Sequence, residues 1–317
     1  MKILITGIHG FVGTNLVKEL SKEHEIYGLD IVAPNLNGVI KTFLWEDLQN
    51  DNFPSVDAII HLAGKAHDTK KQSSSDIYFK VNTGLTERIF DFFLKSSSAK
   101  RFIFFSSVKA AADKVDGDIL TEDIVPKPVG PYGESKIKAE EYIKKHYDFS
   151  SPNEKKVYIF RPCMIHGPGN KGNLNLLFSV VSKGVPYPLG AYENKRSFTS
   201  IANLQFVIKN LLIKDIQSGI YNIADDEPLS TNELISIISK TLNKKEKIWK
   251  IPKVIVNICS KVCDVIHGPL TSERLVKLTE NYIVSNKKIK NALGVENLPV
   301  HAKDGLVETI KSFIRNG

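Results

Sequence analysis

Cysteine, methionine and tryptophan are scarce in this chain of 317 residues, with 3, 2 and 2 copies respectively. The three cysteines, Cys163, Cys259 and Cys263, lack the paired spacing of a zinc site, so we expect no bound metal. Cys259 and Cys263 stand four positions apart and would share one face of a helix. We therefore expect buried thiols, and a reducing, cytoplasmic location fits them.

Long apolar runs are also missing. The segment ILITG near the first residue is too short for a secretory signal, and glycines follow it directly. The most apolar later segment, 254–266, is interrupted by Asn257, Lys261 and Asp264, so we expect no membrane-spanning segment. Its apolar spacing predicts an amphipathic helix that packs against a core, with a membrane surface as the less favoured alternative.

Concentrated positive charge is absent as well. The net charge of +8 comes mostly from lysines scattered along the chain, and arginines do not cluster with aromatic residues. This distribution argues against a nucleic-acid partner, although it can help to attract a small anionic substrate. We find no internal repeat and no low-complexity segment. The length allows one large or two moderate domains.

What the chain does contain is a regular alternation of apolar runs and helical patterns. Strands are expected at KILITG, EIYGLD, VDAIIHL, RFIFFSS, VYIFRP and GIYNIA, and helices at about 11–22, 79–96 and 134–147. This alternation predicts an α/β fold with a parallel sheet that helices cover on both faces. In LSTNELISIISKTL, Ser230 or Thr231 can cap a further helix, with Glu233 in its first turn.

Three glycines, Gly7, Gly10 and Gly13, follow the first expected strand in TGIHGFVG and precede a helix. A turn of this kind lets a pyrophosphate approach backbone N–H groups at the N-terminus of the helix. Asp30 ends the second strand, 17 residues after Gly13 (30 − 13 = 17). A carboxylate there can accept both ribose hydroxyls of an adenosine and repel a 2′-phosphate, so we expect NAD as the cofactor.

Tyr132 and Lys136 form a Y-x-x-x-K pattern in PYGESK, and residues four apart lie on one face of a helix. A lysine ammonium and an oxidised nicotinamide would both favour the phenolate, which makes Tyr132 a usable general base. Ser107 follows the strand RFIFF, 25 residues before Tyr132 (132 − 107 = 25). At the carboxyl edge of a parallel sheet its hydroxyl can hold a substrate oxygen beside the tyrosine.

These motifs together resemble those of an extended short-chain dehydrogenase/reductase of the NAD-dependent epimerase/dehydratase family. The resemblance covers about the first two-thirds of the chain, and it rests on TGIHGFVG, GLD, HLAG, SSVK, PYGESK, RPCMIHGPGNKGN and KRSFTSIANL. The later stretch SERLVKLTENYIVSNKKIKNALG matches the usual ending of the family. The resemblance implies a doubly wound Rossmann sheet in 1–165, to which 197–224 returns, and a smaller substrate-binding domain mainly in 166–317.

The resemblance also implies roles for individual residues. The expected catalytic residues are Ser107, Tyr132 and Lys136. The expected cofactor contacts are Gly7, Gly10, Phe11, Val12, Asp30, Asp47, Leu48, Leu62, Ala63, Gly64, Tyr132, Lys136 and Pro162. The expected substrate contacts are Ser107, Lys109, Asn173, Leu174, Arg196 and Arg274, with the arginines on a diphosphate. Asn82 would support Lys136 or the strand geometry.

The function that the resemblance implies is NAD-dependent chemistry at C4 of a UDP-hexose or UDP-N-acetylhexosamine, as a 4-epimerase that passes through a transient 4-keto sugar. The alternative is an NADH-dependent 4-ketoreductase of a UDP-4-keto-6-deoxy-N-acetylhexosamine, which uses the same residues once. Lys109 and Ser197 depart from the common family pattern and leave the sugar open. A non-catalytic dinucleotide sensor or scaffold is disfavoured, because Tyr132 and Lys136 are both present. Family members commonly form homodimers through the Tyr132 helix, and we expect the same here.

Overall fold

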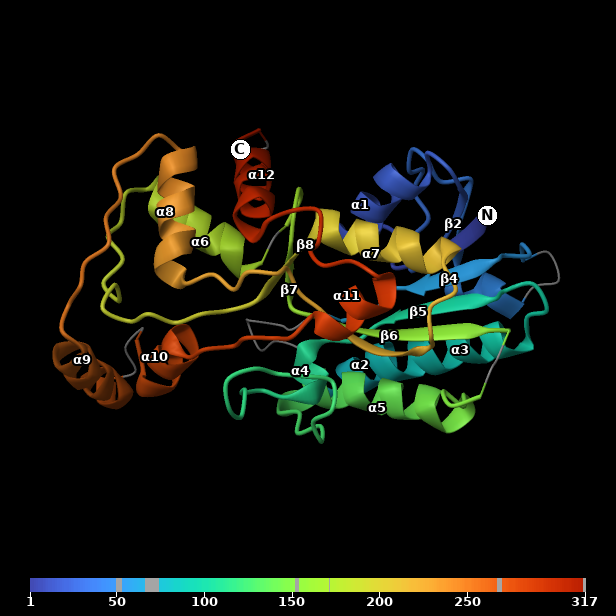
Figure 1. Ribbon diagram of the computed structural model, residues 1–317, viewed down its shortest axis with the longest axis horizontal. Helices are drawn as coiled ribbons and strands as arrows, with labels where there is room; N and C mark the ends of the chain where they lie inside the picture. Colours follow the sequence, from blue (N-terminus) through green and yellow to red (C-terminus); the bar gives the residue numbers. More distant parts are fainter. Residues whose placement is uncertain (50–52, 66–73, 152–153, 171, 267–269, 316–317) are drawn as a thin grey trace.

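A seven-stranded parallel sheet forms the larger half of the molecule (Figure 1). The computed structural model describes residues 1–49, 53–65, 74–151, 154–170, 172–266 and 270–315. The sheet has the order β3-β2-β1-β4-β5-β6-β9, and all of its pairings are parallel. Its strands are β1 (Lys2–Thr6), β2 (Glu25–Asp30), β3 (Lys41–Leu44), β4 (Ala58–His61), β5 (Arg101–Phe105), β6 (Lys156–Pro162) and β9 (Gly219–Ile223). The predicted α/β fold with a doubly wound sheet is thereby confirmed.

The strand order reverses at β1, which has β2 on one side and β4 on the other. In sheets of this kind a ligand binds beyond the carboxyl ends of the strands that flank the reversal. Thr6 and His61 end β1 and β4 as paired residues and therefore mark this place. The strands are apolar along most of their length because helices cover both faces, and all four residues of β4 are buried.

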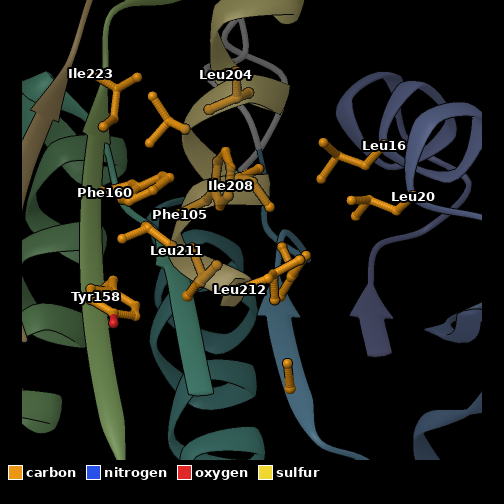
Figure 2. Close-up of a cluster of buried hydrophobic side chains, with 14 of the residues drawn as sticks. Leu16, Leu20, Phe105, Tyr158, Phe160, Leu204, Ile208, Leu211, Leu212 and Ile223 are labelled. Atoms are coloured by element: carbon orange, nitrogen blue, oxygen red, sulfur yellow. The ribbon is translucent and has the colours of Figure 1, made fainter. Parts of the chain in front are cut away.

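Two hydrophobic layers hold helices against the sheet. On one face lie α1 (Phe11–Leu20), α7 (Ile201–Ile213) and α11 (Lys287–Leu293). Figure 2 shows side chains of this layer from α1, α7 and the strands, with labels on Leu16, Leu20, Phe105, Tyr158, Phe160, Leu204, Ile208, Leu211, Leu212 and Ile223. On the other face, α3 (Leu85–Lys95) and α5 (Gly130–His146) cover the alternate strand positions. Each fully buried Leu, Ile or Phe contributes about 1.5–3 kcal/mol.

The smaller half begins after β6 with β7 (Met164–His166) and β8 (Phe198–Ser200), which pair in parallel. Three helices, α6 (Asn173–Ser182), α8 (Thr231–Thr241) and α12 (Ala302–Arg315), pack around a separate hydrophobic core. The chain then returns from β8 to the large sheet through α7 and β9. The late helix α11 also packs on the layer shown in Figure 2, so the C-terminal part of the chain contributes to both halves.

A pair of helices, α9 (Lys253–Ile266) and α10 (Ser272–Thr279), lies at one end of the smaller half, at lower left in Figure 1. The helix predicted over 254–266 is therefore confirmed. Its expected packing against a core is met only along one narrow stripe, because Val256 and Ser260 are the buried residues of α9. Among the described helices, none combines the length and the apolar character that crossing a membrane requires.

The thiols also depart from the sequence-based expectation. Cys259 is exposed and Cys263 is partly exposed, whereas Cys163 is buried. The prediction of buried thiols is wrong for the pair on α9, because the buried stripe of that helix runs through Val256 and Ser260 and leaves Cys259 outside. In the described ranges, no three His, Cys, Asp or Glu side chains gather where they could hold a metal ion.

Several element boundaries differ from those expected. Helix α5 begins at Gly130 rather than near 134, since its first turn accommodates a proline. The helix expected at 79–96 is preceded by α2 (Ser75–Tyr78) and begins with a π-helical segment, η2 (Phe79–Gly84). Strand β3 was not expected, because two polar residues are followed by only two apolar ones and form no longer apolar run. Of the two possible caps of α8, Ser230 is the one used.

A buried ion pair ties α5 to β6. Arg161 donates from Nε and Nη2 to the two carboxylate oxygens of Glu140, at 2.9 and 2.6 Å. Ser106 Oγ donates to the same carboxylate at 2.5 Å. Arg161 and Glu140 are 1% and 0% exposed. This pair fixes the helix that carries Tyr132 and Lys136 against the sheet, and neither charge can reach water if the other is removed.

We expect Glu140→Gln to destabilise the fold, because it leaves the Arg161 guanidinium buried without its counter-charge. The free energy of unfolding, measured by urea denaturation, should fall by about 3–5 kcal/mol. Glu154→Gln is the matched control, since Glu154 pairs with Lys100 at an exposed site, with 2.8 Å between the charged atoms. An unchanged urea midpoint in Glu140→Gln would show that the buried pair does not hold α5 in place.

Candidate active site

The turn between β1 and α1 lies at the carboxyl edge of the sheet and admits only glycine at its first position. Gly7 has a φ of +67°, and a Cβ there would lie 2.8 Å from the backbone N of Ala63. A Cβ on Gly13 would lie 2.5 Å from the carbonyl oxygen of Ile8. The turn is therefore as tight as the glycine spacing predicted, and it packs directly against the segment that follows β4.

The acid predicted for the adenosine ribose lies beside this turn. Asp30 Oδ2 accepts a hydrogen bond from the backbone N of His9 at 3.1 Å. Gly10 is the N-cap of α1, and Phe11 and Val12 form the first turn of that helix. The structure thus brings the glycines, the helix N-terminus and the carboxylate together. These groups fit a dinucleotide, with N–H donors for the pyrophosphate and an acceptor for the ribose hydroxyls.

The remaining residues expected to contact a cofactor lie along the same edge. Leu62 follows β4 and packs on the layer shown in Figure 2, and Pro162 is the last residue of β6. Asp47 and Leu48 belong to a short 3-10 helix, η1 (Trp45–Gln49). Asp47 Oδ2 accepts from the backbone N–H at the end of β3 at 2.9 Å. Leu48 is buried in the opposite hydrophobic layer, so its side chain serves packing.

Two residues that the sequence analysis missed hold the segment after β4 in place. Thr6 Oγ1 hydrogen-bonds His61 Nδ1 at 2.6 Å and accepts from the backbone N of Ala63 at 3.0 Å. His61 Nε2 hydrogen-bonds Thr86 Oγ1 at 2.9 Å. Burial, followed by the charge of Lys136, holds the pKa of His61 well below its ordinary value, so the ring is neutral. A polar residue at the end of each of two buried strands was the signal available in the sequence.

Ser107 and Tyr132 come together as predicted. Ser107 caps α4 (Val108–Ala111) just after β5, and its hydroxyl hydrogen-bonds the phenol of Tyr132. Burial raises the pKa of Tyr132, the Ser107 hydrogen bond opposes that shift, and Tyr78 adds to it. The protein groups alone therefore favour the neutral phenol. A positive charge beside the ring, as in an oxidised nicotinamide, acts in the opposite direction.

Lys136 lies one turn after Tyr132 on the buried face of α5. Its ammonium donates to the carbonyl oxygen of Phe105 at 2.8 Å and lies 5.2 Å from the centre of the Phe104 ring. Burial lowers the pKa of Lys136 to about 8, against the attraction of Glu140. The prediction that this ammonium makes the phenol more acidic is not met here, because a carbonyl holds the ammonium and the pKa of Tyr132 is raised.

Asn82, in the π-helical segment, connects the loop after β4 to α5. Its Oδ1 accepts from the backbone N of Lys65 at 2.7 Å, and its Nδ2 donates to Ser135 Oγ at 2.9 Å. A Cβ on Gly64 would lie 2.9 Å from Asn82 Oδ1 and 3.0 Å from Lys136 Nζ. Glycine is therefore the only residue type at position 64 that lets this loop approach Lys136 so closely. The contacts agree with the supporting role proposed for Asn82.

Lys109, one of the residues expected to contact substrate, is engaged within the protein. Its ammonium donates to the carbonyl oxygen of Asp113 at 2.7 Å and to Asp113 Oδ1 at 3.0 Å. It also lies 4.6 Å from the centre of the Tyr282 ring. The Tyr282 hydroxyl in turn donates to the carbonyl oxygen of Ala112 at 2.7 Å. Lys109 therefore helps to join the α4 region to the smaller half of the molecule.

The two residues expected at the start of α6 differ in environment. Asn173 is the first residue of the helix and is exposed, so it can meet a ligand. Leu174 is 2% exposed and belongs to the core formed by α6, α8 and α12. The side chain of Leu174 therefore packs in that core, and its expected contact with a ligand would come from its backbone.

The two arginines expected to contact a diphosphate both lie at α10. Arg196 Nη1 donates to the carbonyl oxygen of Lys277 at 3.2 Å, and its Nη2 lies 3.6 Å from Glu280 Oε1. Arg274 belongs to the first turn of α10, where Thr271 is the N-cap. Arg274 therefore lies on α10 and Arg196, just before β8, contacts that helix, whereas Ser107, Tyr132 and Lys136 lie at the edge of the sheet.

Comparison with known proteins decides the family. A family model described as the NAD dependent epimerase/dehydratase family matches residues 3–224, from β1 to the residue after β9. The chain belongs to this family. It is therefore an NAD-dependent enzyme of the extended short-chain dehydrogenase/reductase type, and NAD is the cofactor that the glycine turn and Asp30 fit.

Individual relatives of this epimerase/dehydratase extend over nearly the whole chain. The UDP-glucose 4-epimerase of Vibrio cholerae is 30% identical over 328 residues, covering 99% of this chain and 95% of the relative. The N-acetyl-alpha-D-glucosaminyl-diphospho-ditrans,octacis-undecaprenol 4-epimerase of Escherichia coli O157:H7 is 27% identical over 296 residues, covering 91% and 84%. A crystal structure of UDP-glucuronic acid 4-epimerase from Bacillus cereus with UDP-glucuronic acid and NAD superposes with a TM-score of 0.75, at 19% identity and 100% coverage of both chains. The structural likeness shows the shared fold.

Removing the buried ammonium should stabilise the fold. The pKa of Lys136 falls from 10.5 to about 8, so its charge costs the folded state about 3 kcal/mol below pH 8. We expect Lys136→Met to raise the free energy of unfolding at pH 7 by up to about 3 kcal/mol, as urea denaturation without added NAD would measure. The difference should shrink between pH 8 and 10.5, where the folded wild type loses its proton before the unfolded chain does.

Lys145→Met is the control for this experiment, because Lys145 is exposed on the same helix. Its urea midpoint should match that of the wild type at every pH. If Lys136→Met were equally stable or less stable at pH 7, the ammonium would be well satisfied by the Phe105 carbonyl, and its burial would not be a source of strain.

Proposed function

We propose that this enzyme is a 4-epimerase that acts on a UDP-hexose or UDP-N-acetylhexosamine through a transient 4-keto sugar. The observation that supports it is the hydrogen bond between Ser107 and Tyr132 at the carboxyl edge of the sheet, with Lys136 one turn along α5. These three are the proposed catalytic residues. The 30% identity to the UDP-glucose 4-epimerase of Vibrio cholerae supports the choice of reaction and substrate.

In this proposal Tyr132 takes the proton of the sugar 4-hydroxyl while Ser107 holds the same oxygen by a hydrogen bond. NAD, held by the glycine turn and Asp30, would supply the hydride acceptor for C4 and, once reduced, the hydride donor for the other face of the 4-keto sugar. Because burial raises the pKa of Tyr132, proton transfer depends on positive charge near the phenol. Lys136, whose pKa is about 8, carries such a charge at neutral pH, and in this proposal its ammonium also donates to the cofactor ribose.

The other contacts follow from the position of each residue. For the cofactor they are the glycine turn with Phe11 and Val12, Asp30 for the ribose, and the loop from Leu62 to Gly64. For the substrate they are Asn173 at the exposed N-terminus of α6, and Arg196 and Arg274 for the diphosphate. The permanent charge and planar donor geometry of arginine suit that group.

A second substrate class is favoured by the exposed apolar face of α9. The Escherichia coli O157:H7 relative is named for an N-acetylglucosaminyl group on diphospho-undecaprenol. That molecule shares with a UDP-sugar the diphosphate on C1 of the sugar, so the same two arginines can contact either substrate. The two classes differ in what lies beyond the diphosphate, a nucleoside in one case and a long lipid in the other.

We extend the proposal to a homodimer through α3 and α5, which pack side by side on one face of the sheet. The exposed residues of α5 include Glu134, Lys138 and Lys145, so such an interface would be polar. Light scattering after size exclusion would test it, and a monomer would contradict it.

We also propose a cytoplasmic location, since three free cysteines, one of them exposed, suit a reducing compartment.

The decisive experiment uses the purified protein with UDP-N-acetylglucosamine or UDP-glucose and no added cofactor. A 4-epimerase regenerates its cofactor in each cycle, so the galacto epimer should accumulate until equilibrium is reached. The competing 4-ketoreductase would instead convert only a 4-keto-6-deoxy sugar nucleotide and would consume one NADH for each product formed. That outcome would replace the epimerase proposal while leaving the catalytic trio unchanged.

Tyr132→Phe should lower kcat by about 100- to 10,000-fold, because the variant lacks the group that transfers the proton. The binding of NAD, followed by fluorescence quenching, should change little. Tyr142→Phe is the control on the same helix, since the Tyr142 hydroxyl donates to Asp91 Oδ1 at 2.7 Å, away from the trio. A Tyr132→Phe enzyme as active as the wild type would remove Tyr132 from the mechanism.

A further inference from the structure

Helix α9 presents a continuous apolar face to solvent. Six of its valine and isoleucine side chains are at least half exposed: Val254 (69%), Ile255 (50%), Ile258 (58%), Val262 (52%), Val265 (80%) and Ile266 (67%). Large exposed aliphatic side chains are ordinary when scattered, but six on one helix of 14 residues form a patch. Such a patch indicates a surface that something covers.

The spacing shows that the patch is one face and not a consequence of overall hydrophobicity. Val254, Ile258, Val262 and Val265 follow one another at intervals of three or four residues, which places them on one side of the helix. The polar side chains Asn257, Lys261 and Asp264 lie on another side with the same spacing. The helix packs on the rest of the protein along a third, narrow stripe through Val256 and Ser260, and Asn257 and Asp264 on the polar side accept hydrogen bonds from Tyr192 and Ser272.

Positive charge lies on this helix and just before it. Lys250, Lys253 and Lys261 are exposed, and Asp264 is the one acid between 250 and 266, so this segment carries a net charge of +2 (3 − 1 = 2). Lys244 and Lys247 lie farther away, at the α8 end of the connection (Figure 1), where they donate to the carbonyl oxygens of Ser182 and Gly184. Trp249 is 57% exposed just before α9. The carboxylate of Asp264 accepts from Ser272 of α10, at 2.8 Å from its backbone N and 2.6 Å from its hydroxyl, and is turned towards that helix.

We propose that α9 docks on the surface of a lipid bilayer that contains anionic lipids. Its apolar face would enter the boundary between headgroups and acyl chains, while the lysines contact the anionic headgroups and Trp249 sits at the interface. This is the combination of features found in helices that lie in the plane of a membrane. The same features agree with the membrane-surface alternative that the sequence left open for 254–266.

The size of the patch favours a lipid surface over a protein partner. A helix of 14 residues is about 21 Å long and about 10 Å wide, so its face covers roughly 200 Å². A stable protein interface buries about 800 Å² on each partner. The flanking positive charge would also meet itself across a twofold axis in a dimer of two α9 faces. Neither the small area nor the positive charge disfavours a bilayer, since its surface needs no complementary shape and anionic lipids carry the opposite charge.

Docking through α9 would bring the substrate site close to the membrane. Arg274 lies on α10, which packs against α9, and Arg196 donates to the carbonyl oxygen of Lys277 on the same helix. The groups proposed for the diphosphate are therefore neighbours of the membrane-facing helix. This placement suits a sugar diphosphate whose other end is a lipid held in the bilayer, a conclusion that rests on the proposed function, whereas the docking itself does not.

Vesicle flotation tests the docking. The purified full chain is mixed with vesicles of phosphatidylcholine alone, or with 30 mol % phosphatidylglycerol at about 0.1 M salt. We expect the wild type to float with the anionic vesicles. Ile258→Asn/Val262→Asn should reduce the bound fraction at least fivefold. Ile40→Asn/Ile213→Asn is the matched control, since both residues are exposed and apolar on the other half of the molecule, and it should float like the wild type.

Two further measurements separate the possible outcomes. Trp249 fluorescence should shift to shorter wavelength with anionic vesicles, and Trp249→Phe should abolish the shift, since the other tryptophan, Trp45, is buried. The 4-epimerase activity of Ile258→Asn/Val262→Asn on a soluble UDP-sugar should equal that of the wild type. A failure of that activity in the wild type would therefore leave the docking result standing.

Three results would overturn the docking proposal. The first is a wild type that stays with the soluble fraction at every vesicle composition. The second is equal flotation of the wild type and Ile258→Asn/Val262→Asn. The third is a wild-type dimer that this double variant dissociates while neither protein floats, which would show that a second copy of the chain covers α9.

Discussion

A single buried ammonium group, that of Lys136, influences both the electrostatics and the close packing at the carboxyl edge of the sheet. It is removed from water, held by the Phe105 carbonyl and closely approached by the loop at Gly64, where only glycine leaves enough room. Burial, followed by the charge of Lys136, holds the pKa of His61 well below its ordinary value, and burial lowers the pKa of Lys136 itself to about 8. The folded protein thus holds a charged group in an electrostatically unfavourable position at the point where we propose proton transfer, a common relation between stability and function.

Helix α5 is the element that makes this arrangement possible. Tyr132, Lys136 and Glu140 follow one another along it at intervals of four residues, and Lys136 and Glu140 are buried. We propose Tyr132 for proton transfer, Lys136 places a charge one turn further on, and Glu140 attaches the helix to the sheet. Glu140 anchors the helix to the sheet by accepting hydrogen bonds from Arg161 and Ser106. The Tyr132 phenol is therefore positioned by an ion pair two turns further along the helix. A substitution at Glu140 or Arg161 would displace this phenol.

The sequence was informative where the determinants are local. The glycine turn, the acid at the end of β2 and the spacing of Tyr132 and Lys136 each depend on a few consecutive residues, and the structure brings them together. Contacts across the fold could not be found this way: Thr6 meets His61 and Glu140 meets Arg161 only after the sheet has formed. The side of α9 that faces inward was equally hidden, because Val256 on the buried stripe is of the same residue type as the exposed valines, so the apolar pattern does not show which of them is buried.

The path of the chain has a consequence for how the enzyme can open. The backbone passes from β6 into β7, back from β8 into α7, out again after β9 and once more around α11, so several connections link the two halves. Lobes joined in this way can flex but cannot swing apart on a single hinge. A keto sugar formed between them would be retained long enough to turn over before the hydrogen returns to C4. An epimerase needs that confinement, whereas a reductase that releases its product after one transfer does not.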